Sequence, residues 1–491
     1  MQEPVGVDAV EDGPRLRDAA DAKEYLHGLY PLGMKLDLDN ITMLAERLGN
    51  PHRAYPSIHV AGTNGKGSVC QMLAAPLREA GLKVGVYTSP HLVEMNERIV
   101  VDGQAIADMD VLALTRRLLP LVREVAIRSG GHPTFFEVVT AMAFEYFRLA
   151  RVDIAVIEVG LGGRLDSTNI IEPAACCITT IGHDHTQILG STLANIAREK
   201  AGIIKPGVPV VTGVSGKESL QVIEDSCRER GAPLHLARHH IMRADRPPKG
   251  GAAGTFAFSG PNHEFSNVPL PLRGAHQLEN AACALTLLDV LEPERIGLDA
   301  AAYGKRLPDW VRTGFGRLLW AGRLQKVLDA PLLVIDGSHN PPGMRSLAAA
   351  LPDVFGPERF DVVFGVMGDK DLKGILVHLH SFARSITAVA PNVKRSLPAG
   401  DLELRIRDWR SSRAGEGRNA SPLGHALPAV RSSADLRGEL ERILEDRNGR
   451  YLVTGSIFLA GEVMGCLMDM GAATAMGLGL PPQGEAIVDG H

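Results

Sequence analysis

The stretch HVAGTNGKGSVC, residues 59–70, decides the fold class of this chain. It leads from a short apolar run through a glycine-rich loop into a helix-forming segment, which is the order of a phosphate-binding loop. The usual pattern places Ser or Thr directly after Gly-Lys, whereas here Gly67 separates Lys66 from Ser68. The loop is therefore either a nucleotide site of a particular kind or a glycine-rich turn with a surface lysine.

The residues of this loop favour the nucleotide site. Glycines let backbone N–H groups approach an anion closely, and the N-terminus of the following helix adds partial positive charge. Lys66 would neutralise the terminal phosphates, while Thr63 or Ser68 would offer a hydroxyl group. Because an apolar strand leads into the loop, we expect ATP to bind there.

The bulk composition excludes several classes of protein. The 491 residues are enough for two or three domains, and the 45 % hydrophobic and 22 % charged residues are typical of a soluble globular protein. A net charge of −5 gives no reason to expect nucleic acid or a membrane as partner. The six cysteines form no C-x-x-C pair, so we predict neither a zinc site nor disulfides. Without the apolar core of a signal peptide, we expect a cytoplasmic protein.

Short β-branched runs alternate with amphipathic segments along the chain, which predicts an α/β fold with mainly parallel sheets. The alternation weakens around residues 238–265, where we expect a β-hairpin, and around 310–325, where we place a linker. We predict the polar stretch 410–426 to be a surface insertion. The apolar stretch 456–480 contains Glu462 and Asp469, so we read it as a buried helix followed by a loose tail, not a membrane span.

Polar residues at the ends of the predicted strands are candidates for a Mg²⁺ site, since this ion prefers oxygen ligands. Ser89 follows the strand KVGVYT, Glu158 lies near the end of DIAVIEV, and His185 follows CITTIG. Two of them have a plainer interpretation: Glu158 would pair with an arginine such as Arg164, and His185 would be a loop histidine. On the sequence alone, Lys200 would be an ordinary lysine on a helix surface.

The motifs AGTNGKGS, TSPHLVEMNERI, EVGLGGRLDSTN, DHTQILG, REKAGI, GRLQ, DGSHNPPG and VTGS follow one another along the chain. In this order they resemble the folylpolyglutamate synthases, the folate branch of the Mur ligase superfamily. The resemblance extends from about Leu26 to Glu462. In this branch the loop has the form Gly-Lys-Gly-Ser, which accounts for the position of Gly67.

The resemblance implies an N-terminal P-loop ATPase-like domain with a parallel sheet and a smaller C-terminal Rossmann-like α/β domain. We place a flexible N-terminal segment at 1–20, the ATP-binding domain at 21–310, a linker at 311–319, the glutamate-ligase domain at 320–476 and a tail at 477–491. The implied reaction is amide formation: a substrate carboxylate attacks the γ-phosphate of ATP, and L-glutamate then attacks the acyl phosphate.

The resemblance also assigns roles to individual residues. ATP would be held by Thr63, Asn64, Gly65, Lys66, Gly67, Ser68, Asn280, Arg323 and Asp336. Two Mg²⁺ ions would be bound by Ser89, Glu158, His185 and a carbamylated Lys200. The pterin site would be lined by Thr134, Phe135, Phe136, Glu137, Leu165, Asp166 and Ser167, and glutamate would meet His339 and Ser456. Lys66, Glu158, His185, Lys200 and His339 would carry the catalysis.

Two points stay open at this stage. His183 competes with His185 for the metal, although the position in the Asp-His pair favours His185. The triplet Arg164-Leu165-Asp166 resembles bacterial bifunctional members, so we expect a monomeric enzyme that acts on both dihydropteroate and folates. The alternatives are a folylpolyglutamate synthase with a single activity and, from another class, a nucleotide-binding regulator without ligase activity.

Overall fold

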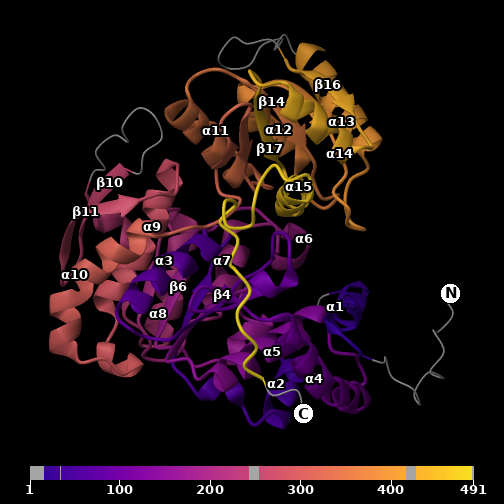
Figure 1. Cartoon of the computed structure of the whole chain (residues 1–491). Helices are drawn as coiled ribbons and strands as arrows, with labels where there is room; N and C mark the ends of the chain where they lie inside the picture. The colour runs from indigo at the N-terminus through magenta and orange to yellow at the C-terminus, as the bar shows by residue number, and fades with distance from the viewer. Residues whose placement is uncertain (1–15, 34, 243–253, 416–426, 489–491) are drawn as a thin grey trace.

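The structure is a computed structural model and describes residues 16–33, 35–242, 254–415 and 427–488. The chain forms a large N-terminal lobe and a smaller C-terminal lobe, which lie one above the other in Figure 1. The prediction of an α/β fold with a parallel sheet in the N-terminal lobe and a separate sheet in the C-terminal lobe is confirmed.

The sheet of the N-terminal lobe has the order β4-β3-β2-β5-β1-β6-β7-β8. Strands β2, β5, β1, β6, β7 and β8 are parallel, and β3 and β4 join the edge in antiparallel pairing. The central strands are buried along their whole length because helices cover both faces, as their continuous apolar sequences predict. Their bounds are β1 Ser57–Ala61, β2 Val84–Tyr87, β3 Ile99–Val101, β4 Gln104–Ala105, β5 Ile154–Glu158, β6 Ala175–Ile178, β7 Val210–Thr212 and β8 Leu234–Leu236.

Helices enclose this sheet, and the start of α5 is fixed by side-chain capping. Thr134 caps α5 by accepting a hydrogen bond from the backbone N–H of Glu137, and the Glu137 carboxylate accepts from the N–H of Thr134, so the two residues form a capping box of the T-x-x-E type. The helices of the N-terminal lobe are α1 Ala19–Gly28, α2 Asp39–Arg47, α3 Lys66–Glu79, α4 Asp108–Ser129, α5 Phe135–Ala150, α6 Thr186–Leu189, α7 Leu193–Ala201, α8 Lys217–Glu229, α9 Ala275–Val290 and α10 Ala300–Gly316.

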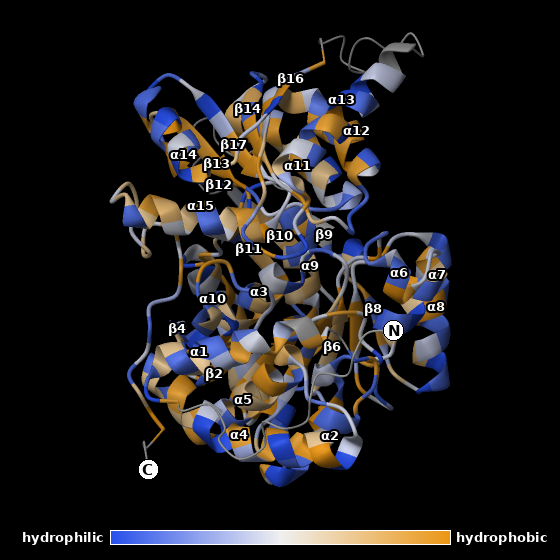
Figure 2. Cartoon of the chain, turned by 90° about the vertical axis from the view of Figure 1, so that its right-hand side faces the viewer, coloured by the Kyte–Doolittle hydropathy of each residue, from blue (hydrophilic) through white to orange (hydrophobic). Residues whose placement is uncertain are grey.

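A small antiparallel sheet packs beside α9 and α10 and confirms the predicted hairpin. Its strands are β9 Ile241–Met242, β10 Gly254–Ser259 and β11 Glu264–Leu270. The buried faces of β10 and β11 join the apolar cluster around α3. Figure 2 shows hydrophobic residues, in orange, on strands inside both lobes.

The C-terminal lobe has its own sheet, in the order β12-β13-β17-β14-β15-β16, which is parallel apart from the β12–β13 pair. The strands are β12 Gln325–Leu328, β13 Leu332–Ile335, β14 Phe360–Phe364, β15 Ala383–Ala388, β16 Ala429–Ser432 and β17 Arg450–Thr454. The helices are α11 Pro341–Phe355, α12 Leu372–Phe382, α13 Ala399–Gly415, α14 Leu436–Glu445 and α15 Ile457–Asp469.

The expected linker and N-terminal segment need correction. Helix α10 continues to Gly316, through the first part of the predicted linker 311–319, because Val311 and Phe315 are buried at helical spacing. Within the segment 1–20, residues 1–15 lie outside the described residues. Leu16, however, is buried, and its carbonyl accepts two hydrogen bonds from Arg116, so this end of the segment is anchored.

The predicted insertion 410–426 begins inside helix α13, and residues 416–426 lie outside the described residues. The apolar stretch near the C-terminus does form the buried helix α15. Along the described residues, no helix is both long and apolar enough to cross a membrane.

The tail after α15 is not loose. It runs down the surface of the N-terminal lobe, as the yellow trace in Figure 1 shows. Ala105 at the sheet edge exchanges backbone hydrogen bonds with Pro482 and Gly484. The buried carboxylate of Asp110 accepts hydrogen bonds from the N–H groups of Ile487 and Val488, at 2.7–3.0 Å. A buried carboxylate at the start of α4 thus fixes the tail, although the two lie 377 positions apart in the sequence.

Candidate active site

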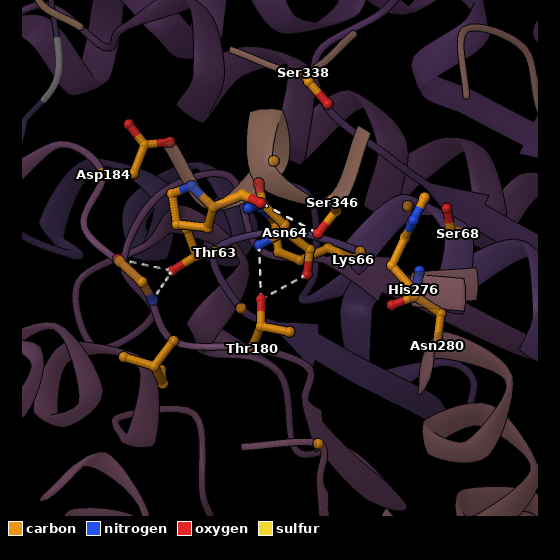
Figure 3. Close-up of a pocket in the computed structure, with 18 of the residues that line it drawn as sticks. Thr63, Asn64, Lys66, Ser68, Thr180, Asp184, His276, Asn280, Ser338 and Ser346 are labelled. Atoms are coloured by element: carbon orange, nitrogen blue, oxygen red, sulfur yellow. Dashed lines mark hydrogen bonds between the residues drawn. The ribbon is translucent and has the colours of Figure 1, made fainter. Parts of the chain in front are cut away.

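A cavity of about 450 Å³ lies between the two lobes, where the glycine loop meets the C-terminal sheet. Figure 3 shows several of its wall residues, among them Lys66, Ser68, Asp184, His276 and Ser338. The wall contains most of the predicted ATP, metal and catalytic residues: Thr63, Asn64, Gly65, Lys66, Gly67, Ser68, Ser89, Glu158, His185, Lys200, Asn280, Arg323, Asp336 and His339. The structure therefore brings together residues that are far apart in the sequence.

The glycine loop is held rigidly at the end of β1. The Thr63 hydroxyl donates to the carbonyl of Gly182 at 3.2 Å and accepts from its N–H at 3.0 Å. The backbone N–H of Asn64 donates to the Thr180 hydroxyl at 3.1 Å, as the dashed lines in Figure 3 show. Helix α3 begins at Lys66, so its free N–H groups and partial positive charge face the cavity.

The unusual Gly67 has a structural reason. A Cβ at this position would lie 2.8 Å from the indole ring of Trp320, which packs against the first turn of α3. Gly65 has a φ of +88°, and a Cβ there would collide with the side-chain oxygen of Asn280. The loop needs Gly65 for its backbone conformation and Gly67 for the close approach of the Trp320 ring.

Glu158 at the end of β5 is 4 % exposed and lies behind Lys66. Its Oε1 is 3.7 Å from Lys66 Nζ, and its Oε2 accepts a hydrogen bond from the N–H of Ser89 at 3.1 Å. Burial raises the pKa of Glu158, although the charge of Lys66 opposes this shift. The alternative interpretation, in which Glu158 pairs with Arg164, is wrong, because Arg164 Nη2 lies 2.9 Å from Glu199 Oε1 and pairs with that residue.

Lys200 is not on a helix surface, so that plainer interpretation is wrong. It lies on the buried face of α7, is 4 % exposed, and donates to the carbonyl of Gly62 at 2.9 Å. Burial, and then the charge of Lys66, lower the pKa of Lys200 to about 7. The side-chain amine is therefore largely neutral just above neutral pH, which is unusual for a lysine.

His185 follows β6 and lies beside a charged cluster that joins the lobes. Lys370 of the C-terminal lobe lies 2.6 Å from Asp184 Oδ1 and 3.2 Å from His185 Nε2. Burial lowers the pKa of His185 to about 4, so the ring is neutral and able to act as a ligand. His183 is exposed and is not part of the cavity wall.

The C-terminal lobe supplies the opposite wall. The carboxylate of Asp336, after β13, accepts hydrogen bonds from the N–H groups of Leu324 at 2.8 Å and Ser338 at 2.9 Å. Burial lowers the pKa of Arg323, and the nearby charges of Asp336 and Glu158 counteract this effect. His339 Nε2 is 3.5 Å from Asp184 Oδ2 across the interface.

The predicted pterin residues and Ser456 are not part of this cavity wall. Phe135 is buried and stacks on Tyr30, with ring centroids 3.9 Å apart, while Phe136 packs against Gly160. Ser456 caps α15. The remaining predicted pterin residues are Thr134, Glu137, Leu165, Asp166 and Ser167.

Asp166 is already engaged by its own loop. Its Oδ2 accepts from the N–H of Leu161 at 2.8 Å, and its Oδ1 accepts from the N–H and hydroxyl of Thr168. It therefore shapes the segment 160–168, whatever else it contacts.

Sequence reasoning missed several wall residues. Thr180, Asp184, His276 and Ser346 line the cavity, and Asn340 and Lys370 lie beside it. Asp184 and Asn340 are direct neighbours of predicted residues in DHTQILG and DGSHNPPG, so the motifs themselves were the available signal. Nothing in the sequence around Lys370 indicated that it reaches the other lobe.

The donor set fits a hard cation. Glu158 and Ser89 offer oxygen atoms, which Mg²⁺ prefers, and the Lys66 ammonium, 3.7 Å from the buried Glu158 carboxylate, is too far away to donate a hydrogen bond to it. Among the described residues, no group of three or more His, Cys, Asp or Glu side chains is arranged to hold a metal ion by itself. A magnesium ion here would therefore depend on further oxygen ligands, such as those of phosphates and water.

Two family models match this chain. The model of the Mur ligase middle domain matches residues 60–288, and that of the Mur ligase glutamate ligase domain matches residues 322–434. The chain is 37 % identical to the dihydrofolate synthase/folylpolyglutamate synthase of Bacillus subtilis, over 79 % of this chain and 90 % of that protein. It is 36 % identical to the enzyme of the same name from Mycobacterium tuberculosis, over 86 % of this chain and 88 % of the relative.

Solved structures that resemble this chain carry the same enzyme names as its sequence relatives. The folylpolyglutamate synthase of Mycobacterium tuberculosis complexed with ADP and AMPPCP superimposes with a TM-score of 0.78 at 32 % identity, covering 91 % of this chain and 98 % of that one. The Escherichia coli FolC in complex with DHPP and ADP gives a TM-score of 0.76 at 28 % identity, covering 94 % and 100 %.

Proposed function

Because this chain belongs to the dihydrofolate and folylpolyglutamate synthase family, whose domains are those of Mur ligases, we propose that it ligates L-glutamate both to dihydropteroate and to tetrahydrofolates. It is an ATP-using ligase with small-molecule substrates. The observation that carries the proposal is the cavity itself, in which the glycine loop faces the Asp336–Ser346 region of the glutamate ligase domain. A nucleotide switch would not need this second wall.

The proposed reaction has two steps. An oxygen of the acceptor carboxylate attacks the γ-phosphorus of ATP, and the bond to the ADP oxygen breaks, giving an acyl phosphate. The amino group of L-glutamate then attacks the acyl carbon, loses a proton, and expels phosphate. There is little covalent work for the protein, so positioning and charge neutralisation carry the catalysis.

The described residues suit these tasks. The N–H groups at the start of α3 and the Lys66 ammonium would hold the β- and γ-phosphates, as charge-assisted donors do. Asn280, Arg323 and Asp336 would hold the rest of ATP from both lobes. His339 and Ser456 would meet the incoming glutamate, and Thr134–Glu137 with Leu165–Ser167 would hold the pterin.

We propose Ser89, Glu158 and His185 as the residues that hold a first Mg²⁺ and a carbamylated Lys200 as a ligand of a second. When bound, these ions would neutralise charge on the phosphate groups during transfer. The buried position of Lys200 supports the carbamate, because only a neutral amine reacts with CO₂ and burial favours that form. A carbamate offers anionic oxygen atoms, which a hard cation prefers.

We further propose that the enzyme is a cytoplasmic monomer. Its six cysteines are all free thiols, which agrees with a reducing compartment.

The proposal is tested with purified protein, ATP, Mg²⁺ and L-glutamate, and with dihydropteroate or tetrahydrofolate in parallel reactions. We expect ADP release to require both glutamate and an acceptor, and each acceptor to gain glutamate. Activity on tetrahydrofolate alone would establish the single-activity alternative. ADP release without any acceptor would support a nucleotide-binding regulator. Lys66→Ala serves as the matched variant, and we expect it to lose both activities while its thermal unfolding stays close to that of the parent.

A further inference from the structure

Arg98 is a buried arginine whose side chain contacts His91, Tyr30 and Phe135. It ends the short helix Met95–Arg98 and is 4 % exposed. Its Nε donates to His91 Nδ1 at 2.9 Å, its Nη2 donates to the Tyr30 hydroxyl at 3.3 Å, and its Cζ lies 5.0 Å from the centroid of Phe135. Within the described ranges, Arg98 forms no ion pair with any carboxylate. A buried charge is normally paired, so this one calls for an anionic partner from outside the chain.

The surroundings of Arg98 do not neutralise its charge. Burial, followed by the charge of Arg98 itself, keeps the pKa of His91 well below its usual value, so the ring accepts the hydrogen bond as a neutral imidazole. Among the described residues, nothing accepts a hydrogen bond from Nη1 of Arg98. This group remains available to an oxygen of a ligand.

The position of Arg98 connects the two halves of the proposed acceptor site. On one side it lies over Phe135, the proposed pterin segment. On the other side, the Arg98 carbonyl accepts a hydrogen bond from the N–H of Thr88 at 3.0 Å, one residue before Ser89, whose own N–H donates to Glu158. The charge of Arg98 also opposes the rise that burial causes in the pKa of Glu158. A folate whose pterin lies at Phe135 and whose reacting carboxylate lies beside Glu158 would pass this guanidinium.

We propose that Arg98 binds the α-carboxylate of the acceptor's terminal glutamate and so favours folates over dihydropteroate. This inference rests on the proposed function. Dihydropteroate has a single carboxylate, which is consumed in the reaction, whereas a folate also carries an α-carboxylate that does not react. That anion must leave water on binding, and a preorganised guanidinium is suited to receive it with two parallel hydrogen bonds.

In the test, the parent enzyme and the Arg98→Met variant are each assayed with three acceptors. They are tetrahydrofolate, dihydropteroate, and a tetrahydrofolate analogue in which 4-aminobutyrate replaces glutamate and the α-carboxylate is therefore absent. For Arg98→Met we expect the KM for tetrahydrofolate to rise about 10- to 100-fold, the range of a lost charge-assisted hydrogen bond. That rise should exceed the rise for dihydropteroate by at least about tenfold, and kcat should change less than KM.

The analogue separates recognition from folding. The parent enzyme should bind it about 10- to 100-fold more weakly than tetrahydrofolate, whereas Arg98→Met should not distinguish the two. Arg78→Met, which removes a partly buried arginine beside Gly314, is the matched control and should alter all three acceptors equally.

If Arg98→Met does not fold, the parent enzyme's preference for tetrahydrofolate over the analogue still decides, and equal binding overturns the inference. Equal losses of Arg98→Met on tetrahydrofolate and dihydropteroate also overturn it and make Arg98 a structural residue. Either result leaves the proposed function standing. That function fails only if the parent enzyme extends neither acceptor.

Discussion

The side-chain amides of Asn64 and Asn340, 276 positions apart in the chain, exchange two hydrogen bonds of 3.1 and 3.0 Å. Asn64 belongs to the glycine loop, and Asn340 caps helix α11 by accepting from the N–H of Gly343 at 2.9 Å. Asn340 also donates to Asp184 at 2.9 Å. This pair therefore fixes the glutamate ligase domain against the loop that we propose to hold ATP.

Asn340→Asp should reduce ligation by about tenfold or more, because the carboxylate cannot donate to Asn64 or to Asp184 and repels the latter. Stability should change little, since the carboxylate still caps α11. Asp371→Asn at the cap of α12, where Asp371 accepts from Gly374 at 2.9 Å, is the control and should keep full activity. Thermal unfolding and turnover of both variants are compared, and normal turnover of Asn340→Asp would remove this pair from the account.

Gly67→Ala should weaken the binding of ATP. The new methyl group would lie 2.8 Å from the Trp320 ring, closer than carbon atoms can approach, so the Trp320 side chain must move away from the glycine loop. We expect the KM for ATP to rise about tenfold, measured at saturating glutamate and acceptor. Gly400→Ala is the matched control, since a Cβ at that position meets no atom within 4 Å. An unchanged KM in Gly67→Ala would show that the Trp320 contact does not matter for the nucleotide.

Lys200 should form a carbamate whose occupancy rises with pH. Burial lowers the pKa of Lys200 to about 7. The fraction of the side chain in the neutral, reactive form therefore increases as the pH rises through 7, whereas at pH 6 the side chain is largely protonated. With ¹³CO₂ held at a constant dissolved concentration, ¹³C NMR should show a carbamate signal at pH 8 that fades towards pH 6.

Two variants control this measurement. Lys205→Ala removes a nearby lysine that donates to the Asn169 carbonyl at 3.0 Å, and it should keep the carbamate signal. Lys200→Ala should lose the signal, be nearly inactive, and regain part of its activity with short-chain carboxylic acids. Full activity of Lys200→Ala in a buffer purged of CO₂ would exclude a role for the carbamate.

Asp110→Ala should release the C-terminal tail from the N-terminal lobe. The buried carboxylate accepts hydrogen bonds from the N–H groups of Ile487 and Val488, and the alanine side chain of the variant offers no acceptor in its place. Hydrogen exchange at these two amides should become about tenfold faster or more, because each loses a charge-assisted hydrogen bond. Asp299→Ala, which removes the exposed cap of α10, should leave their exchange unchanged. Protected amides in Asp110→Ala would mean that packing alone holds the tail.

The sequence predicts much of this fold because its signals are local. The continuous apolar run of β5, the capping box at Thr134 and the strand–loop–helix order around Lys66 each depend on neighbouring residues. The end of α10 was placed too early because Gly314 and Gly316 obscure the helical spacing of Val311 and Phe315. The tail was read as loose because its anchor, Asp110, lies far away in sequence and resembles any acidic residue at a helix start.

In the candidate site, too, residues within local motifs were predictable, whereas contacts between distant segments were not. The motifs placed Lys66, Glu158 and Asp336 at one cavity, since each lies at or after the carboxyl end of a strand and these ends share an edge of the sheet. The burial of Lys200 was invisible in the sequence, because the short helix α7 shows no more than an ordinary polar face around it. Contacts between the lobes, such as that of Lys370 with Asp184, depend on how the sheets meet and have no local signal.

The central claim is that ligation proceeds through an acyl phosphate formed in the cavity between the lobes. The most direct test uses dihydropteroate with both carboxylate oxygens replaced by ¹⁸O, together with ATP and L-glutamate. The account predicts one ¹⁸O atom in each phosphate released and one in the new amide carbonyl, because the attacking carboxylate oxygen leaves with the phosphate. Phosphate without ¹⁸O, released alongside the amide product, would contradict it.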